Sequence, residues 1–326
     1  MRARKIVPAV AAAAVLATAA ACGGTSGGGD TGGGAVNGKD IAFVPGVSGD
    51  SFYITMGCGI RSEAKKYGLK INEQAPQQFD PSQQTPIVSG VVAKKPAGML
   101  IAPTDAQAML PPLLRAKQAG IKLGTVDTSL AKSGVSSFGV STDNRKAGAA
   151  AADSLAKLVG GKGTVLVIAF KAGVSTSDER QNGFLDEIKK YPNIKALKPQ
   201  VNDNDPAKAA SIVSATLAAN PGLTGIFATN QFAAEGAATG LRNAKKQGKV
   251  KLVGFDAGPV QVQQLRRGEV QALIAQQPNQ IGVQAVDNMV KLLKGQKPAA
   301  QTGTGTVAIT KDDLKSGQAA TYKTKC

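Results

Sequence analysis

Short apolar runs alternate with segments of helical spacing along most of the chain, from residue 41 to residue 309. Gly or Pro stands at most of the joins, as is common where one element gives way to the next. Such alternation predicts parallel sheets whose faces are covered by helices. The length of 326 residues favours two domains. We expect an α/β fold of two doubly wound parallel-sheet lobes, although the pattern alone also fits a barrel of eight units.

Several elements can be bounded from the apolar pattern. The pattern predicts a helix over 105–119, a single strand over 194–201 and a single strand over 304–309. In doubly wound sheets and in barrels alike, ligands bind beyond the carboxyl ends of the parallel strands. The loops that follow the strands are therefore the place to look for binding residues.

The composition excludes several kinds of active site. The chain has no His, which excludes a Ser-His-Asp triad and a His-ligated metal, and three Cys are too few for a four-thiolate metal site. We expect no metal and no cofactor. The net charge is +17, but the Lys and Arg residues are scattered and no nucleic-acid-binding motif is present. We interpret the charge as a solvated surface and expect no nucleic acid partner.

The N-terminus has the features of a secretion signal. Arg2, Arg4 and Lys5 precede an apolar run over 6–21, which is shorter than a membrane span, and the run ends at Cys22. The sequence around Cys22 resembles a bacterial lipobox. We therefore expect a lipoprotein signal peptide over 1–21, a lipid anchor on Cys22, a Gly-rich tether over 22–40, and an extracytoplasmic location on the outer face of the cell membrane. The alternative is ordinary signal cleavage with an incidental cysteine.

Two further cysteines, Cys58 and Cys326, remain in what would be an oxidising compartment. We predict that they form a disulfide that ties the C-terminus to the first helix. The alternative is a buried Cys58 and a free thiol at the terminus.

The loops after the predicted strands carry many side chains with paired hydrogen-bonding groups. Carboxylates, amides and one guanidinium suit a hydroxyl-rich ligand, because each sugar hydroxyl both donates and accepts. Two aromatic residues beside them could pack against the C–H face of a sugar ring. The candidate residues are Asp50, Phe52, Tyr53, Asp127, Arg180, Asn230, Asp256 and Gln276.

Several polar and aromatic residues in these loops also have a structural interpretation. Asp105, Ser175 and Asp205 precede helices and are better explained as N-caps than as ligand contacts. Phe52 and Tyr53 could be core residues of the first helix, and a surface ion pair could explain the arginine. Asp127 and Asp256 directly follow strongly apolar runs, where a carboxylate has less structural reason to stand, so we favour a site role for both.

With these residues in view, the chain resembles the ribose-type periplasmic binding proteins, which are the type I solute-binding components of bacterial ABC importers. The resemblance covers residues 41 to about 310. It is carried by a series of segments in this order: IAFVPGVSGDSFY (41–53), GMLIAPTDAQA (98–108), VDT (126–128), SDERQNGF (177–184), GIFATNQFAAEGA (225–237), LVGFDAGP (252–259) and ALIAQQPNQIG (272–282).

The resemblance implies that all eight candidate residues contact the ligand, with Phe52 and Tyr53 as the aromatic pair. Three positions differ from the family's pattern and argue against ribose itself. Asp50 replaces an amide, Thr128 replaces an arginine, and Asn204 stands near the position of the second lobe's stacking aromatic. We therefore expect an aromatic wall on one side of the cleft only, and a monosaccharide or polyol of unspecified identity as the ligand.

The resemblance also implies a domain division and a mechanism. An N-terminal lobe (41–141 plus 277–304) and a C-terminal lobe (142–276 plus 305–315) would be joined by a three-stranded hinge, with a tail over 316–326. Ligand bridging the lobes would stabilise a closed form. A membrane permease and its ATPase would recognise that form, the chain would be a monomer, and it would be no enzyme.

Three other functions compete with this one. The same fold could present a sugar to a membrane receptor kinase, which the sequence does not separate from transport. A secreted glycosidase could use Asp127 and Asp256 as its two carboxylates, but hydroxyl binding explains the pair equally well. A sugar-responsive repressor would need an N-terminal helix-turn-helix, where this chain has a signal and tether.

Overall fold

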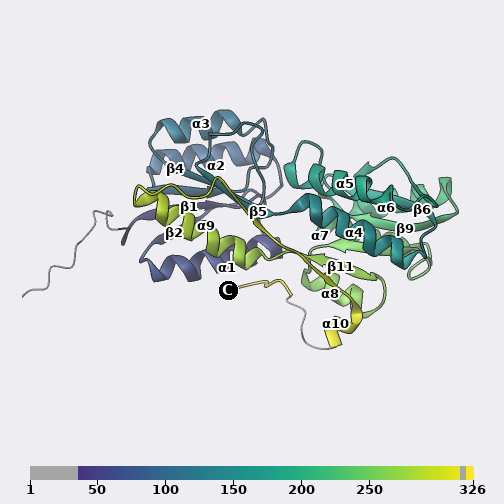
Figure 1. Cartoon of the computed structure of the whole chain (residues 1–326). Helices are drawn as coiled ribbons and strands as arrows, with labels where there is room; N and C mark the ends of the chain where they lie inside the picture. The colour runs from purple at the N-terminus through teal and green to yellow at the C-terminus, as the bar shows by residue number, and fades with distance from the viewer. Residues whose placement is uncertain (1–35, 316–320) are drawn as a thin grey trace, which may run out of the picture. The chain divides into compact units, whose positions relative to one another are not determined.

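The computed structural model describes residues 36–315 and 321–326 of the chain (Figure 1). The expected signal peptide over 1–21, the anchor cysteine Cys22 and most of the expected tether lie outside the described residues. Residues 36–40, which we expected to belong to the tether, are part of the first lobe. Val36 is buried, the Gly38 amide donates to the carbonyl of Gly68, and the first strand begins at Asp40.

The first lobe is built on a sheet of six parallel strands. Apolar residues alternate between the two faces of this sheet, so Ile41 and Phe43 face one helix pair and Ala42 and Val44 face the other. The strands, in spatial order, are β12 (Gln301–Thr304), β5 (Phe138–Thr142), β4 (Lys122–Val126), β3 (Gly98–Ile101), β1 (Asp40–Val44) and β2 (Lys70–Glu73). The helices are α1 (Ser51–Lys66) and α9 (Pro278–Leu293) on one face, and α2 (Pro81–Lys94) and α3 (Leu110–Gln118) on the other.

The second lobe has a sheet of seven strands in which one edge strand, β13, runs antiparallel to its neighbour. The strands, in spatial order, are β13 (Val307–Ile309), β11 (Ala272–Ala275), β10 (Lys251–Phe255), β9 (Leu223–Ala228), β6 (Gly163–Ala169) and β7 (Ile194–Ala196), with β8 (Gln200–Val201) also paired to β6. The helices are α4 (Asn144–Leu158), α5 (Ser175–Ile188), α6 (Pro206–Ala219), α7 (Gln231–Asn243), α8 (Pro259–Arg266) and α10 (Lys311–Lys315).

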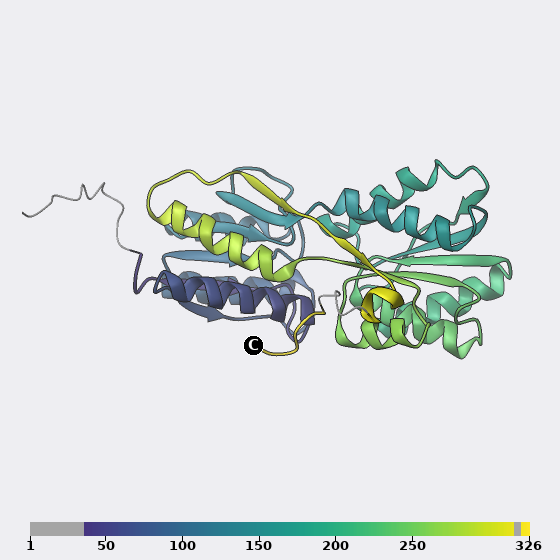
Figure 2. The ribbon, with the colours of Figure 1, turned by 60° about the horizontal axis from the view of Figure 1, so that its bottom comes forward.

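The chain passes between the two sheets three times: between β5 and α4, between β11 and α9, and between β12 and β13 (Figures 1 and 2). The fold class inferred from the alternation is therefore confirmed, as two doubly wound lobes and not a barrel. The single strand expected over 304–309 is wrong. Its two halves pair in different sheets, because the third passage falls between Thr304 and Val307.

Two other expected elements are shorter in the structure. The helix expected over 105–119 begins at Leu110, because the Asp105 side chain accepts hydrogen bonds from the amides of Gln107 and Ala108 and holds a turn there. The strand expected over 194–201 is split into β7 and β8, which pair with different stretches of β6.

Local capping explains why the helices start beside the carboxyl ends of the strands. Asp50, Asp80 and Asp205 each accept a hydrogen bond from a backbone amide in the first turn of the helix that follows. Proline occupies the first helical position of α2 and of α6, where its missing amide costs nothing. Sequence-local chemistry thus brings each helix N-terminus, and the loop before it, to the edge of the sheet where the two lobes face each other.

Candidate functional site

A cavity lies between the two lobes, at the carboxyl ends of both sheets. Residues from both lobes line it: Asp50, Phe52, Tyr53, Phe79, Asp127, Phe170, Thr176, Arg180, Asn204, Asn230, Asp256 and Gln276. The structure therefore brings together all eight residues that the sequence singled out.

The first turn of α1 supplies three of the lining residues. Asp50 is the N-cap, and its carboxylate accepts the amide of Phe52 at 2.8 Å. The rings of Phe52 and Tyr53 meet edge to face with centroids 5.2 Å apart, and both side chains are almost fully buried. The two aromatics thus belong to the first-lobe core and line the cavity at once, so the core and site interpretations of the sequence both apply.

Asp127 and Asp256 occupy equivalent places, each directly after a central strand. Both have a positive φ, of 61° and 78° respectively, which is uncommon for a residue other than glycine. Such backbone conformations cost roughly 1–3 kcal/mol and are concentrated at functional sites. The Tyr53 hydroxyl donates to the Asp127 carboxylate at 2.7 Å and orients it.

Among the described residues that line the cavity, Arg180 alone carries a guanidinium. Its Cζ lies 3.8 Å from the centre of the Phe255 ring, Nε donates to Oδ1 of Asn144 at 2.8 Å, and Nη1 donates to the carbonyl of Thr229 at 2.9 Å. Its backbone is fixed by close packing of α4 on α5. A Cβ added at Gly148 would lie 2.1 Å from the Arg180 carbonyl oxygen.

Asp256 is the centre of a hydrogen-bond network that reaches the passages between the lobes. Its Oδ2 accepts the amide of Gln231 at 3.1 Å, and its Oδ1 accepts Nε2 of Gln276 at 2.7 Å. The Thr142 hydroxyl donates in turn to Oε1 of Gln276 at 2.6 Å. Thr142 ends β5 and Gln276 follows β11, so two of the three passages are tied directly to a residue of the cavity wall.

Asn230 has a structural role beside its place in the cavity wall. Its side-chain oxygen accepts the amide of Ala233 and caps α7, while its Nδ2 donates to Oδ1 of Asn204 at 2.6 Å. Asn204 thus lines the cavity as a hydrogen-bonding group, where the resemblance implied an aromatic.

The cavity is rich in carboxylates, which share it with a single guanidinium. Burial, and after it the charge of Asp256, raises the pKa of Asp50 to about 7. Burial raises the pKa of Asp127 to about 6, against the opposing effects of Arg180 and Tyr53. Burial also raises the pKa of Asp256. Asp50 and Asp127 can therefore gain or lose a proton near neutral pH.

The shifted pKa of Asp50 predicts how stability changes with pH. An unfolded aspartate releases its proton near pH 3.9, whereas folded Asp50 keeps it to about pH 7. Between these values the folded state binds more protons, so its free energy of unfolding falls as the pH rises. Asp50→Asn keeps the cap but cannot ionise. We expect this variant to raise the melting temperature of the ligand-free protein by about 5 °C at pH 8 and by roughly a third as much at pH 5, which lies only about one unit above the pKa of an unfolded aspartate.

The measurement is thermal unfolding of both proteins at pH 5 and pH 8. Asp105→Asn is the matched control, because Asp105 also accepts two backbone amides but lines no part of the cavity. The melting temperature of Asp105→Asn should differ from that of wild type by the same amount at pH 5 and at pH 8. Equal melting temperatures of wild type and Asp50→Asn at pH 8 would contradict the prediction.

Sequence reasoning missed two aromatic residues of the site, Phe79 and Phe170. Their rings meet edge to face across the lobe boundary, with centroids 5.7 Å apart. The expectation of an aromatic wall on one side only is therefore wrong, since Phe170 supplies an aromatic from the second lobe. Phe170 directly follows β6 and Phe79 lies in the loop between β2 and α2, so the rule of inspecting strand ends applies to both.

The residues expected to act as caps lie outside the cavity wall. Asp205 caps α6, and Asp105 holds the turn before α3. Ser175 is not a cap. Its hydroxyl accepts the amide of Ser129 at 2.9 Å, which is a contact between the lobes. Thr128 donates its hydroxyl to the carbonyl of Pro103 at 2.8 Å and does not line the cavity.

Further hydrogen bonds join the lobes around the cavity. The Ser51 hydroxyl donates to Oε1 of Gln231 at 2.7 Å, and Nζ of Lys171 donates to the carbonyl of Phe79 at 2.9 Å. These contacts come from the first turn of α1 and from the loop before α2, which are the segments that also line the cavity. The structure thus shows the lobes closed on one another.

Comparisons with known proteins agree with this architecture. A model of the periplasmic binding protein domain matches residues 41–297. The D-allose-binding periplasmic protein of Escherichia coli is 32% identical over 255 residues, which are 76% of this chain and 82% of that protein. The ribose import binding protein of the same organism is 31% identical over 261 residues, or 80% of this chain and 87% of that protein.

Solved structures give the same result. A solute-binding protein of an ABC transporter from Agrobacterium vitis, with bound α-D-tagatopyranose, is 39% identical, with a TM-score of 0.85 over 87% of this chain and 99% of that one. A solute-binding protein from Burkholderia graminis in complex with D-arabinose is 31% identical, with a TM-score of 0.81 over 86% of this chain and 98% of that one. By their names all four relatives are binding proteins, and one of them is periplasmic. The chain belongs to the family of proteins built on the periplasmic binding protein domain.

Proposed function

We propose that this chain is the extracytoplasmic solute-binding component of an ABC importer, which captures a monosaccharide or polyol between its lobes and catalyses no reaction on it. One observation carries the proposal: the cavity combines aromatic faces from both lobes with carboxylates, amides and a guanidinium. Aromatic faces suit the C–H surface of a sugar ring, and the polar groups suit its hydroxyls. Relatives that bind tagatose, arabinose, allose and ribose support the sugar class.

The ligand would act by stabilising closure. In the proposed mechanism Asp50, Tyr53 and Asp127 of the first lobe and Arg180 and Asp256 of the second hold one ligand together. A ligand that bonds to both lobes favours the closed form by the difference between its affinities for the closed and open forms. Gln276, at the passage after β11, donates to Asp256 and accepts the hydroxyl of Thr142, at the passage after β5, so closure and the geometry of the site are coupled.

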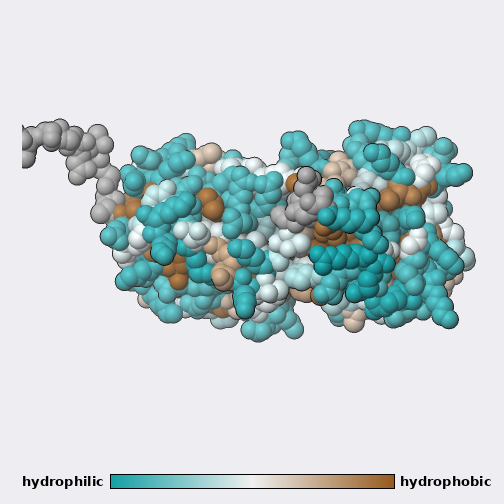
Figure 3. Space-filling model, turned by 90° about the horizontal axis from the view of Figure 1, so that it is seen from below, coloured by the Kyte–Doolittle hydropathy of each residue, from teal (hydrophilic) through white to brown (hydrophobic). Residues whose placement is uncertain are grey.

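Delivery would require a membrane complex. We propose that a permease and its ATPase recognise the closed form, and that a lipid on Cys22 anchors the mature chain to the membrane. None of the helices in residues 36–315 and 321–326 is long and apolar enough to cross a bilayer. On the face seen in Figure 3, hydrophilic residues cover most of the surface and hydrophobic ones form small separate groups, which supports a monomer.

A thermal-shift screen tests this function. We expect at least one sugar or polyol in a panel of pentoses, hexoses, ketoses, polyols, cyclitols and amino sugars to stabilise the protein. At about 1,000 times its dissociation constant a ligand adds roughly 4 kcal/mol to the free energy of unfolding. Amino acids and nucleosides serve as the control panel.

The bound sugar should then be recovered chemically unchanged after prolonged incubation, which separates a binding protein from a glycosidase. Stabilisation by the control panel alone, from a well-folded sample, would overturn the sugar assignment and leave the family unaffected.

A further inference from the structure

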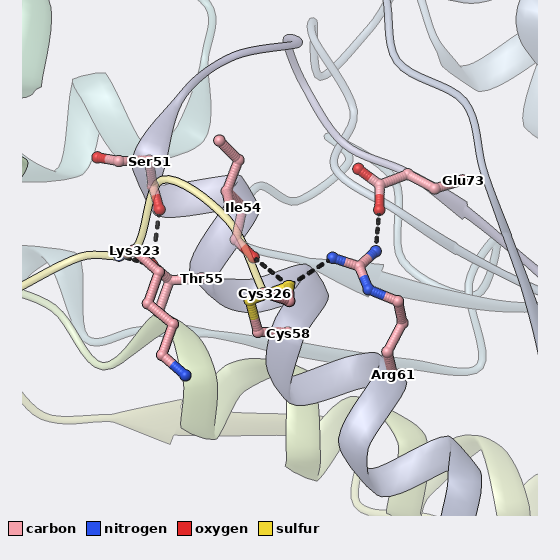
Figure 4. The surroundings of a disulfide bond; sticks show 8 residues. All are labelled: Ser51, Ile54, Thr55, Cys58, Arg61, Glu73, Lys323 and Cys326. Carbon is pink, nitrogen blue, oxygen red and sulfur yellow. Dashed lines mark hydrogen bonds and ion pairs between the residues drawn. A yellow bond between two sulfur atoms is a disulfide. The ribbon is translucent and has the colours of Figure 1, made fainter.

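The last six residues of the chain return to the boundary between the lobes. Cys326 forms a disulfide with Cys58 in α1, and the Lys323 amide donates to the hydroxyl of Thr55, also in α1, at 2.7 Å (Figure 4). The disulfide that the sequence predicts is therefore present. Arg61, one turn further along α1, donates to Sγ of Cys326 at 2.8 Å (Figure 4). The end of the chain is thus attached to the first lobe.

Tyr322, four residues before this attachment, is inserted into the second lobe. Its side chain is almost fully buried, and its amide donates to the carbonyl of Ala257 at 3.0 Å. Its hydroxyl accepts the amide of Gln276 at 2.8 Å and donates to Oδ1 of Asp256 at 3.2 Å. Its ring centre lies 6.1 Å from that of Phe52 in the first lobe. One side chain thus contacts the loop after β10, the passage after β11 and the aromatic wall.

The hydroxyl of Tyr322 acts on two residues that line the cavity, although Tyr322 itself is not part of the lining. A hydroxyl that donates to a carboxylate favours its ionised form and fixes its orientation. Burial raises the pKa of Asp256, and the hydrogen bonds from Gln276 and Tyr322 oppose that rise. Tyr322 therefore helps to keep Asp256 charged and correctly aimed for the hydroxyl of a ligand.

The disulfide limits where Tyr322 can go. Four residues of extended chain span at most about 14 Å. While Cys326 stays bonded to Cys58, Tyr322 remains within that distance of Cys326, whose Cα lies 5.4 Å from the Cα of Cys58 in α1. The attachment to one lobe and the insertion into the other also join the two lobes at a fourth place, in addition to the three passages.

We propose that Tyr322 is a positioning residue for the ligand cavity, acting through Asp256 and Gln276, and that the Cys58–Cys326 disulfide holds it in place. Ligand affinity then depends on a segment that touches no ligand. The affinity measurement that tests this proposal rests on the proposed function. The second measurement uses the ligand-free protein and does not depend on that function.

The first test compares Tyr322→Phe with wild type by calorimetric titration of D-tagatose, D-allose and D-ribose. Phenylalanine keeps the ring beside Phe52 and removes only the hydroxyl. We expect the dissociation constant of every sugar that binds wild type to rise about tenfold, as is typical for a hydrogen bond to a charged group. Tyr191→Phe is the matched control, since the Tyr191 hydroxyl donates to Asp153 at 2.9 Å on the surface of the second lobe. The control should bind as wild type does.

The second test needs no ligand and asks whether Tyr322 acts through Asp256. The Asp256 carboxyl is titrated by ¹³C NMR in wild type and Tyr322→Phe, with Asp256→Asn to assign its signal. The other charged groups that influence it are Asp50, Asp127, Arg180 and Glu235, and they are the same in both proteins. We expect the pKa of Asp256 to be higher in Tyr322→Phe than in wild type. When the pH is lowered, the variant should therefore lose its affinity for sugar at a higher pH than wild type does.

A double-mutant cycle tests the role of the disulfide. Without the Cys58–Cys326 bond, Tyr322 should leave its position. Adding Tyr322→Phe to C58S/C326S should therefore shift the pKa of Asp256 little further, and it should change the affinity for sugar by less than a further factor of two. If Tyr322→Phe weakens sugar binding as much in C58S/C326S as it does in wild type, the disulfide does not hold Tyr322 in place and its proposed role is overturned.

An unchanged Asp256 titration in Tyr322→Phe would overturn the positioning role, whether or not a sugar binds. If wild type binds none of these three sugars but the titration shifts, the positioning role stands, and the thermal-shift panel then decides the proposed function.

Discussion

Arg180→Met is expected to weaken sugar binding at least 100-fold. Of the cavity-lining residues in the described part of the chain, Arg180 is the only cation, and it shares the cavity with Asp50, Asp127 and Asp256. Removing one partner from a buried charged group typically costs 3–5 kcal/mol, because the remaining charge has lost its compensation. Each 1.4 kcal/mol corresponds to a factor of ten in affinity. The carboxylates respond by taking up protons, so they offer fewer acceptors to ligand hydroxyls.

The same substitution removes two structural hydrogen bonds. Asn144 loses the donor to its side-chain oxygen, and the Thr229 carbonyl loses the donor from Nη1. Arg180→Lys restores the charge but not the planar fork that reaches Asn144 and Thr229 at once while stacked on Phe255. We therefore expect the lysine variant to bind more weakly than wild type and more tightly than the methionine variant.

Calorimetric titration with the sugar that stabilises wild type measures this series, and circular dichroism checks that each variant is folded. Arg145→Met is the matched control. Arg145 lies on α4, is exposed, and pairs with Asp186 on the surface. It should retain wild-type affinity, because an exposed ion pair contributes little. An affinity of folded Arg180→Lys and Arg180→Met within threefold of wild type would contradict the role of Arg180 in the site.

The second large effect concerns stability. Loss of the disulfide in C58S/C326S is expected to lower the melting temperature by about 5–10 °C. The bond joins residues 268 apart, so it closes most of the described chain into one loop. In the chain-entropy model such a loop restricts the unfolded state by ~5 kcal/mol, and measured values are usually smaller. The loss also frees the Lys323 and Tyr322 segment from α1.

Thermal unfolding with and without a reductant provides the measurement and its control. Reductant should lower the melting temperature of wild type to that of C58S/C326S, and it should leave C58S/C326S unchanged. Wild type that unfolds at the same temperature with and without reductant, with two thiols alkylated in the reduced sample, would contradict the prediction.

Much of the fold could be predicted because its signals are local. The apolar run of β6 is buried along its second half, as expected for a central parallel strand covered on both faces. The Asp205 cap acts within two or three residues of sequence, and the structure has it where the pattern indicates. The errors came where local sequence gives no guidance. Thr304 and Val307 belong to different sheets, and only the pairing of each with a distant strand decides that.

The site was predictable for a related reason. Parallel strands end at a common edge, so residues 77 positions apart, such as Asp50 and Asp127, can be placed together from the order of elements alone. Phe79 and Phe170 obey the same rule. However, a phenylalanine near a strand end is more often a core residue, and the edge-to-face contact that makes this pair part of the cavity exists only after the lobes close.

The sequence by itself determined the alternating elements and the residues at the strand ends, and it favoured the two-lobed class and the pairing of Cys58 with Cys326. Each of these depends on periodicity, on local hydrogen bonds or on the number of partners available. Only the tertiary structure decided what those residues do to one another: that Tyr322 reaches Asp256 across 66 positions, and that Gln276 ties the passages to the cavity. Such contacts depend on how the two folded lobes lie against each other. The burial that follows raises the pKa of Asp50, Asp127 and Asp256. Neither the contacts nor the burial can be specified by a residue's neighbours in sequence.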